Sequence, residues 1–187
     1  MKSYDYANRQ GVEKISWERF GTMTRGLVEQ LAKEKVDVVI GIARGGLIPA
    51  TAVAAALRCE MFPIRLTRRM HDEIVHSTPV VLLDVAIQVA NRKCAVVIDE
   101  IADTGQTLTR AVQLVSRRGV PRVLTATLAS HSWSDPHPNY TALETDALVV
   151  FPWDENVYIN GKWQTHPEIE NAIQLQRNLN EFLPESS

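Results

Sequence analysis

The chain has 187 residues, of which 45% are hydrophobic and 22% charged, a composition typical of a globular protein. This length suits one domain, residues 1–187, with a sizeable core. The formal net charge of -2 argues against a basic surface, so we expect no nucleic-acid or membrane partner. No apolar run approaches the length of a membrane span, and Cys59 and Cys94 fit buried thiols, which together predict a soluble cytoplasmic protein.

The N-terminal third predicts an arm followed by alternating helices and strands. Residues 1–14 are polar and without pattern, so we expect a loosely held arm. Ser16 is a plausible N-cap of a helix whose apolar positions recur every three or four residues, from Trp17 to Leu31. Further along we expect buried strands over 36–42 and 61–67, with a helix over 47–57 between them.

The remainder continues the alternation less regularly. The charged stretch 68–79 has neither period and predicts a loop, while 80–93 is ambiguous, a strand followed by an irregular connection. Strands are expected over 123–128 and 147–151, and a terminal helix over 167–183. Strands alternating with helices predict an α/β fold, a parallel sheet flanked by helices on both faces.

The most informative stretch runs from Cys94 to Leu108. Its apolar residues 95–98 predict a doubly buried strand, and two carboxylates, Asp99 and Glu100, follow at once. The residues 103–107 (D-T-G-Q-T) then lead into a helical pattern. Ligands of open α/β sheets lie beyond the carboxyl ends of strands, and a Gly/Thr turn opening a helix suits a phosphate. An ordinary strand–helix turn, capped by Asp or Thr, would show the same pattern.

A second candidate anion site follows the strand predicted over 36–42. The sequence there is Ala43-Arg44-Gly45-Gly46. Glycines allow close backbone approach, and the arginine supplies a forked set of donors. On their own, the glycines are equally typical of a tight turn.

The segment V-V-I-D-E-I-A-D-T-G-Q-T resembles the signature of the type I phosphoribosyltransferases. With G-I-A-R-G-G-L-I-P-A and V-V-F-P-W-D, the chain looks most similar to the xanthine–guanine (6-oxopurine) members and their small archaeal and bacterial relatives. The resemblance implies transfer of a 5-phosphoribosyl group from phosphoribosyl pyrophosphate (PRPP) to a purine base. It also implies a small hood subdomain from roughly 1–20 and 130–187, a mobile loop at about 68–79, and a homo-oligomer, either dimer or tetramer.

The resemblance assigns the PRPP-binding roles residue by residue. The ribose hydroxyls would contact Asp99 and Glu100, and Asp103 would be the catalytic acid–base group near N7 of the purine. Mg²⁺ would be held mainly through PRPP, with Asp99 and Glu100 as candidate ligands. The 5′-phosphate would bind Asp103, Thr104, Gly105, Gln106 and Thr107, and the pyrophosphate would bind Arg44, Gly45, Arg68 and Arg69.

The resemblance places the base against His131, Leu148, Val149 and Asp154. His131 stands where relatives have a lysine, and Leu148 where they have an aromatic ring, while Glu100 replaces the second aspartate of the usual pair. From the overall resemblance we expect a purine of the guanine, xanthine or hypoxanthine class. The alternatives are another nitrogen heterocycle, or a regulator that senses PRPP or a nucleotide without catalysis.

Overall fold

The computed structural model describes residues 9, 11–67, 69–70, 73–74 and 78–182. The chain forms two compact units: one comprises residues 21–145, and the other comprises 2–20 with 146–187. Residues 130–145, assigned to the hood from the sequence, belong to the first unit because they extend its sheet. Strands and helices beginning in the first unit are β2 Val38–Ala43, α2 Leu47–Leu57, β3 Glu60–Thr67, β4 Arg69–Met70, β5 Glu73–Ile74, β6 Val80–Leu83, β7 Cys94–Ala102, α3 Gln106–Arg117, β8 Arg122–Ser130 and β9 Tyr140–Glu144.

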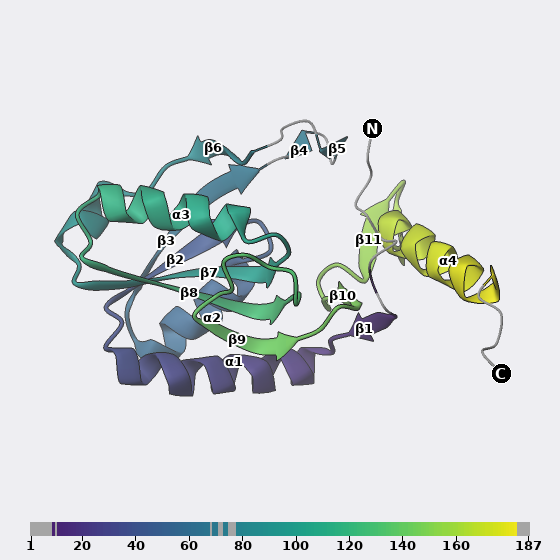
Figure 1. The fold of residues 1–187 in the computed structure, drawn as a ribbon, viewed down its shortest axis with the longest axis horizontal. Coiled ribbons are helices and arrows are strands. Elements are labelled where there is room, and N and C mark those ends of the chain that lie inside the picture. Colours follow the sequence, from purple (N-terminus) through teal and green to yellow (C-terminus); the bar gives the residue numbers. More distant parts are fainter. Residues whose placement is uncertain (1–8, 10, 68, 71–72, 75–77, 183–187) are drawn as a thin grey trace. The chain divides into compact units, whose positions relative to one another are not determined.

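The first unit is built on a six-stranded sheet in the order β6-β3-β2-β7-β8-β9. Five of these strands run parallel, and only β6 is antiparallel to its neighbour β3. Figure 1 shows α3 on one face of the sheet and α2, with α1 (Trp17–Leu31), on the other. The predicted α/β class with a mainly parallel sheet is thus confirmed.

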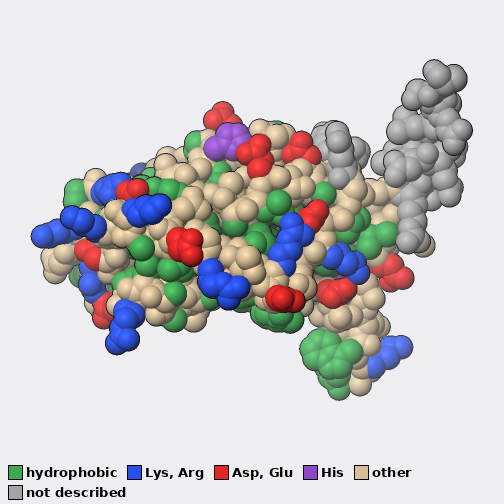
Figure 2. All heavy atoms as spheres, turned by 90° about the horizontal axis from the view of Figure 1, so that it is seen from below, with side chains coloured by type: hydrophobic (Ala, Val, Ile, Leu, Met, Phe, Trp, Pro, Cys, Tyr) green, Lys and Arg blue, Asp and Glu red, His purple; other side chains and the backbone are tan. Residues whose placement is uncertain are grey.

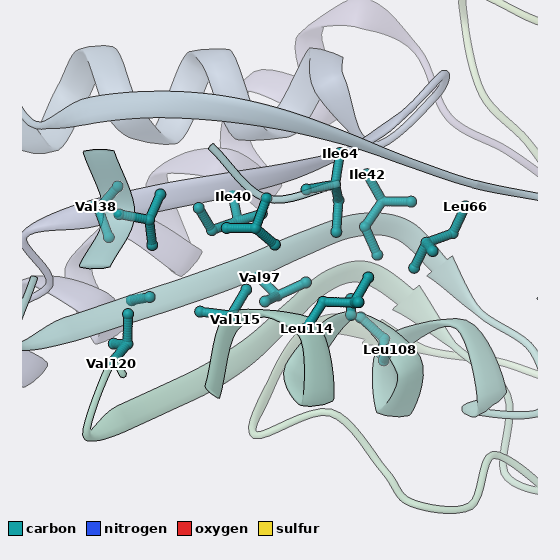
Figure 3. Packing of buried hydrophobic residues seen from close by; sticks show 14 of the residues in the cluster. Val38, Ile40, Ile42, Ile64, Leu66, Val97, Leu108, Leu114, Val115 and Val120 are labelled. Carbon is teal, nitrogen blue, oxygen red and sulfur yellow. The ribbon is translucent and has the colours of Figure 1, made fainter. Parts of the chain in front are cut away.

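Alternating side chains of β2 pack into two separate cores, as expected for a strand covered on both faces. Val38, Ile40 and Ile42 face α3, whose Leu108 and Leu114 belong to the same cluster (Figure 3). The other face packs against α1 and α2 through a second cluster that includes Leu31, Val39, Ala50, Val53, Val96 and Ile98. These two cores hold the carboxyl ends of β2 and β7 side by side.

The second unit consists of short elements. They are β1 Val12–Lys14, β10 Leu148–Val150, β11 Asn156–Ile159, β12 Lys162–Thr165 and α4 Pro167–Phe182, together with the first turn of α1. β1 pairs in parallel with β10, and β11 forms an antiparallel hairpin with β12. The expectation of an unpatterned arm is therefore wrong for residues 12–14, whose backbone pairs with a strand far along the chain.

Several local predictions are tested directly. The helix predicted over 47–57 is α2, and Ser16 caps α1, since its Oγ accepts a hydrogen bond from the Arg19 backbone N–H at 3.1 Å. In the stretch predicted to be a loop, β4 and β5 pair over two residues each. Strand β9 and the β11–β12 hairpin were not predicted.

The surface carries charges of both signs. Figure 2 shows Lys and Arg side chains interspersed with Asp and Glu on the face viewed, as the small net charge implies. Across the part of the chain described here, no helix combines the length and the hydropathy needed to span a bilayer.

Candidate functional site

Two adjacent carboxylates lie near the carboxyl end of β7. Asp99 is half-buried, and its Oδ1 accepts a hydrogen bond from the Glu100 backbone N–H at 3.0 Å. Burial, followed by repulsion from the Glu100 carboxylate, raises the pKa of Asp99 well above its ordinary value. Glu100 Oε2 is buried and has no hydrogen-bond partner among the described residues. Such a pair is suited to a ligand that brings hydrogen-bond donors or a cation.

The glycines that follow β2 pack directly on these carboxylates. A Cβ built on Gly45 would lie 2.8 Å from Glu100 Oε2, and one built on Gly46 would lie 2.8 Å from Asp99 Oδ1. Neither distance is tolerated by a real side chain, so this approach requires glycine. Arg44 is exposed beside them, and the Ala43–Arg44 peptide bond is cis. The structure therefore joins two motifs that stand more than 50 residues apart in the sequence.

The turn between β7 and α3 has the form of an anion site. Gly105 adopts a φ of +77° and caps α3, whose first residue is Gln106. Its carbonyl accepts hydrogen bonds from the backbone N–H of Thr109 at 2.9 Å and from its hydroxyl at 3.0 Å. Thr104 and Gln106 are exposed, so the N-terminal turn of α3, with its positive dipole end, is accessible to a phosphate.

The segment after β8 packs against this turn. A Cβ on Gly105 would lie 2.7 Å from the carbonyl carbon and oxygen of Asp135. Trp133 donates its indole N–H to Asp103 Oδ1 at 2.9 Å. No role for Trp133 was predicted; the available signal was its position just past the carboxyl end of a strand, where ligands of such sheets bind.

His131 is fully buried in the first unit. Its Nδ1 lies 2.6 Å from the carbonyl oxygen of Thr145, and its ring stacks on Trp133 with centroids 4.4 Å apart. A carbonyl can only accept, so Nδ1 carries the hydrogen of this bond. Contact between His131 and a base stays a prediction.

The other predicted base contacts belong to the second unit. Leu148 is 6% exposed and packs in a cluster with Val150 and Ala172, whereas Val149 is half-buried and Asp154 is exposed. Their part in base binding also stays a prediction. Of the three arginines assigned to pyrophosphate, Arg44 is exposed beside the glycines, Arg68 lies outside the described residues, and Arg69 is described only as part of β4.

Within the described ranges, no three His, Cys, Asp or Glu side chains converge as a metal site. At the carboxyl edge of the sheet, the Asp99–Glu100 pair offers carboxylate oxygens to a cation. Their hard carboxylate oxygens, one of them buried and unpartnered in the described chain, suit Mg²⁺ when a ligand supplies the remaining oxygens.

The protein is of the α/β class, with a mainly parallel sheet whose carboxyl edge carries a carboxylate pair and two glycine turns, the position at which ligands of open α/β sheets bind. Residues 10–160 match the phosphoribosyl transferase domain family, and the chain belongs to this family.

Three relatives illustrate the range of similarity. The transcriptional regulator GfcR of Archaeoglobus fulgidus is 31% identical over 98 residues, 52% of this chain and 49% of the regulator, so the match spans about half of that protein. The xanthine-guanine phosphoribosyltransferase of Idiomarina loihiensis is 25% identical over 147 residues, 77% of this chain and 88% of the enzyme. The crystal structure of a purine phosphoribosyltransferase from Pyrococcus horikoshii is 28% identical with a TM-score of 0.69, covering 81% of this chain and 99% of that one.

Proposed function

We propose that this protein transfers the 5-phosphoribosyl group of PRPP to a purine base of the guanine, xanthine or hypoxanthine class, releasing pyrophosphate. The observation that carries the proposal is the packing of Gly45 and Gly46 onto Asp99 and Glu100. It brings an arginine–glycine turn, a carboxylate pair and the helix-opening turn 103–107 to one edge of the sheet. PRPP has three matching parts: a pyrophosphate, a ribose with vicinal hydroxyls and a 5′-phosphate.

Each part of PRPP finds groups of suitable chemistry. The ribose hydroxyls donate to Asp99 and to the buried Oε2 of Glu100, which then gains a partner. The 5′-phosphate accepts from backbone N–H groups of the 103–107 turn, at the N-terminus of α3. The pyrophosphate binds the Gly45 backbone and the guanidinium of Arg44, and Arg68 and Arg69 add positive charge in this proposal.

Members of this family generally use PRPP as its magnesium complex, and the residues present fit that cation. Asp99 and Glu100 would hold it together with oxygens of the ligand. Bound there, Mg²⁺ neutralises the charge of the departing pyrophosphate. A cation would also stabilise ionised Asp99, whose pKa is raised by burial and by Glu100.

Asp103 is the acid–base group that accepts a hydrogen bond or proton from the purine. A purine that attacks C1 of the ribose through N9 becomes more nucleophilic when a carboxylate accepts a hydrogen bond or proton at N7. Asp103 lies at the start of the phosphate turn and is half-buried, which suits a group shared between ligand and protein. Positioning and charge neutralisation supply most of the remaining acceleration.

The test is pyrophosphate release from Mg–PRPP over a panel of purine and pyrimidine bases, with a base-free reaction as the control for hydrolysis. We expect release that depends on guanine, xanthine or hypoxanthine. Binding of PRPP without release for any base would overturn the enzymatic proposal. It would favour a regulator that senses PRPP without catalysis, and the similarity of this chain to a transcriptional regulator, GfcR, is consistent with a regulatory role.

A second candidate is a phosphoribosyltransferase for a different nitrogen heterocycle. His131 donates its Nδ1–H to the Thr145 carbonyl, so this hydrogen is not available to a 6-oxo group. Leu148 is likewise occupied in a hydrophobic cluster. Release with another base, and none with 6-oxopurines, would select this candidate.

A further inference from the structure

We propose that Trp133 is a positioning residue for Asp103, an inference that rests on the proposed function. The indole Nε1–H donates to Asp103 Oδ1 over 2.9 Å, across 30 residues of sequence. This is a charge-assisted bond to the carboxylate assigned to proton transfer. It restrains the rotation of that carboxylate, which is the positioning role that we assign to Trp133.

The backbone that carries Trp133 is tied to the backbone that carries Asp103. The His131 N–H donates to the Ala102 carbonyl at 3.0 Å, directly before Asp103. Beyond Trp133, the Asp135 carbonyl packs on Gly105, directly after the Asp103–Thr104 pair. The segment that carries the indole is therefore held by two contacts to the turn that carries Asp103. These contacts keep Trp133 and Asp103 in a fixed relative position.

The plane of the indole is set by the residue beneath it. The His131 ring stacks on Trp133 at an interplanar angle of 18° and is itself fully buried. Its Nδ1–H bond to the Thr145 carbonyl prevents rotation of the imidazole. Trp133 remains 38% exposed, so one side of the indole is packed while the other is accessible.

The decisive variant is Trp133→Phe, which keeps a flat ring on His131 but removes the donor. We expect kcat to fall about 10- to 100-fold, the effect of losing one hydrogen bond to a charged, positioned group. The dissociation constant of Mg–PRPP should stay within about threefold, because the bond does not contact the phosphate turn's N–H groups. The matched control is Trp163→Phe, a substitution at a 71% exposed ring of the second unit, which should change neither value.

A double-mutant cycle separates positioning from general stability. If Trp133 acts through Asp103, Trp133→Phe should lower the residual turnover of Asp103→Asn by less than about twofold. An equal fold-loss in both backgrounds, or wild-type turnover in Trp133→Phe, would overturn the proposal.

A readout that does not depend on turnover is the indole N–H region of the ¹⁵N–¹H spectrum, in which four tryptophans contribute. Trp133→Phe identifies one signal by its loss, and Asp103→Asn should shift that signal while leaving the one lost in Trp163→Phe in place. An unshifted Trp133 signal would refute the inference. A shifted signal in a protein that releases no pyrophosphate would support the bond while the proposed function fails.

Discussion

Asp103 is the side chain on which the proposed chemistry depends. Asp103→Asn keeps the shape and the acceptor for Trp133 but removes the base, so we expect turnover to fall about 10²- to 10⁴-fold. Mg–PRPP binding, measured by calorimetry, should be nearly unchanged. Asp84→Asn is the control, since Asp84 is 53% exposed, forms a surface ion pair with Arg118 and accepts a hydrogen bond from the Val85 backbone N–H through Oδ1, an acceptor that asparagine keeps. Unchanged turnover in Asp103→Asn would remove this residue from the chemistry.

The raised pKa of Asp99 makes the stability of the folded protein depend on pH. Its pKa is raised in the folded protein by burial and by Glu100, so the folded state holds that proton more tightly than the unfolded chain. Stability therefore falls as the pH rises from the ordinary carboxyl pKa through the higher folded pKa. Asp99→Asn should unfold at a higher temperature than the wild type at pH 7, with the difference shrinking toward pH 4. A gain that grows toward acid would contradict this assignment.

The residues that the sequence identified are those with a local signal. Asp99 and Glu100 lie near the end of β7, and Gly45 follows β2, each within a short sequence motif, so their meeting at one edge of the sheet was predictable. The bond between Trp133 and Asp103 was not, because it depends on the path of the segment 131–136. Leu148 packs in a core cluster with Val150 and Ala172, while its contact with the base stays a prediction.

At the scale of elements, the contact between the turn after β2 and the end of β7 brings the two halves of the proposed site together. Gly45→Ala places a Cβ on the Glu100 carboxylate, so we expect Mg–PRPP affinity to fall at least about tenfold as Glu100 is displaced. Calorimetric titration measures this loss. A Gly45→Ala variant that binds Mg–PRPP like the wild type would show that the contact between Gly45 and Glu100 is not needed for ligand binding.

Gly21→Ala is the matched control for that variant. Gly21 lies in α1, and a Cβ there would meet nothing within 4 Å. Because alanine is the better helix former, this variant should gain about 0.5–1 kcal/mol of unfolding free energy with unchanged PRPP binding.

Helices and strands were predictable from the sequence where burial gives them a periodic pattern or a continuous run of apolar residues. β7 has an uninterrupted apolar run because both its faces are covered, and α2 ends where its apolar run ends. β9 was missed because every residue of this edge strand is only half-buried or exposed. β1 was missed because three residues that pair with a strand more than 130 positions away leave no local pattern.

At the scale of the whole molecule, the fold and the family define the class of protein but not its activity. This chain is similar both to a phosphoribosyltransferase and to a protein named as a transcriptional regulator, and a fold alone does not decide between such functions. The net charge of -2 and the mixed charges of Figure 2 favour a small anionic ligand bound locally over a nucleic-acid surface. A homo-oligomer, dimer or tetramer, remains our proposal from the family resemblance.

The most direct measurement is mass-spectrometric identification of the product formed from Mg–PRPP and an equimolar mixture of purine and pyrimidine bases. Product identity is more direct than pyrophosphate release, because water can also release pyrophosphate. We predict a nucleoside 5′-monophosphate of one 6-oxopurine, absent without Mg²⁺ and strongly reduced in Asp103→Asn. Ribose 5-phosphate alone, or unchanged PRPP, would contradict the assignment of this protein as a base phosphoribosyltransferase.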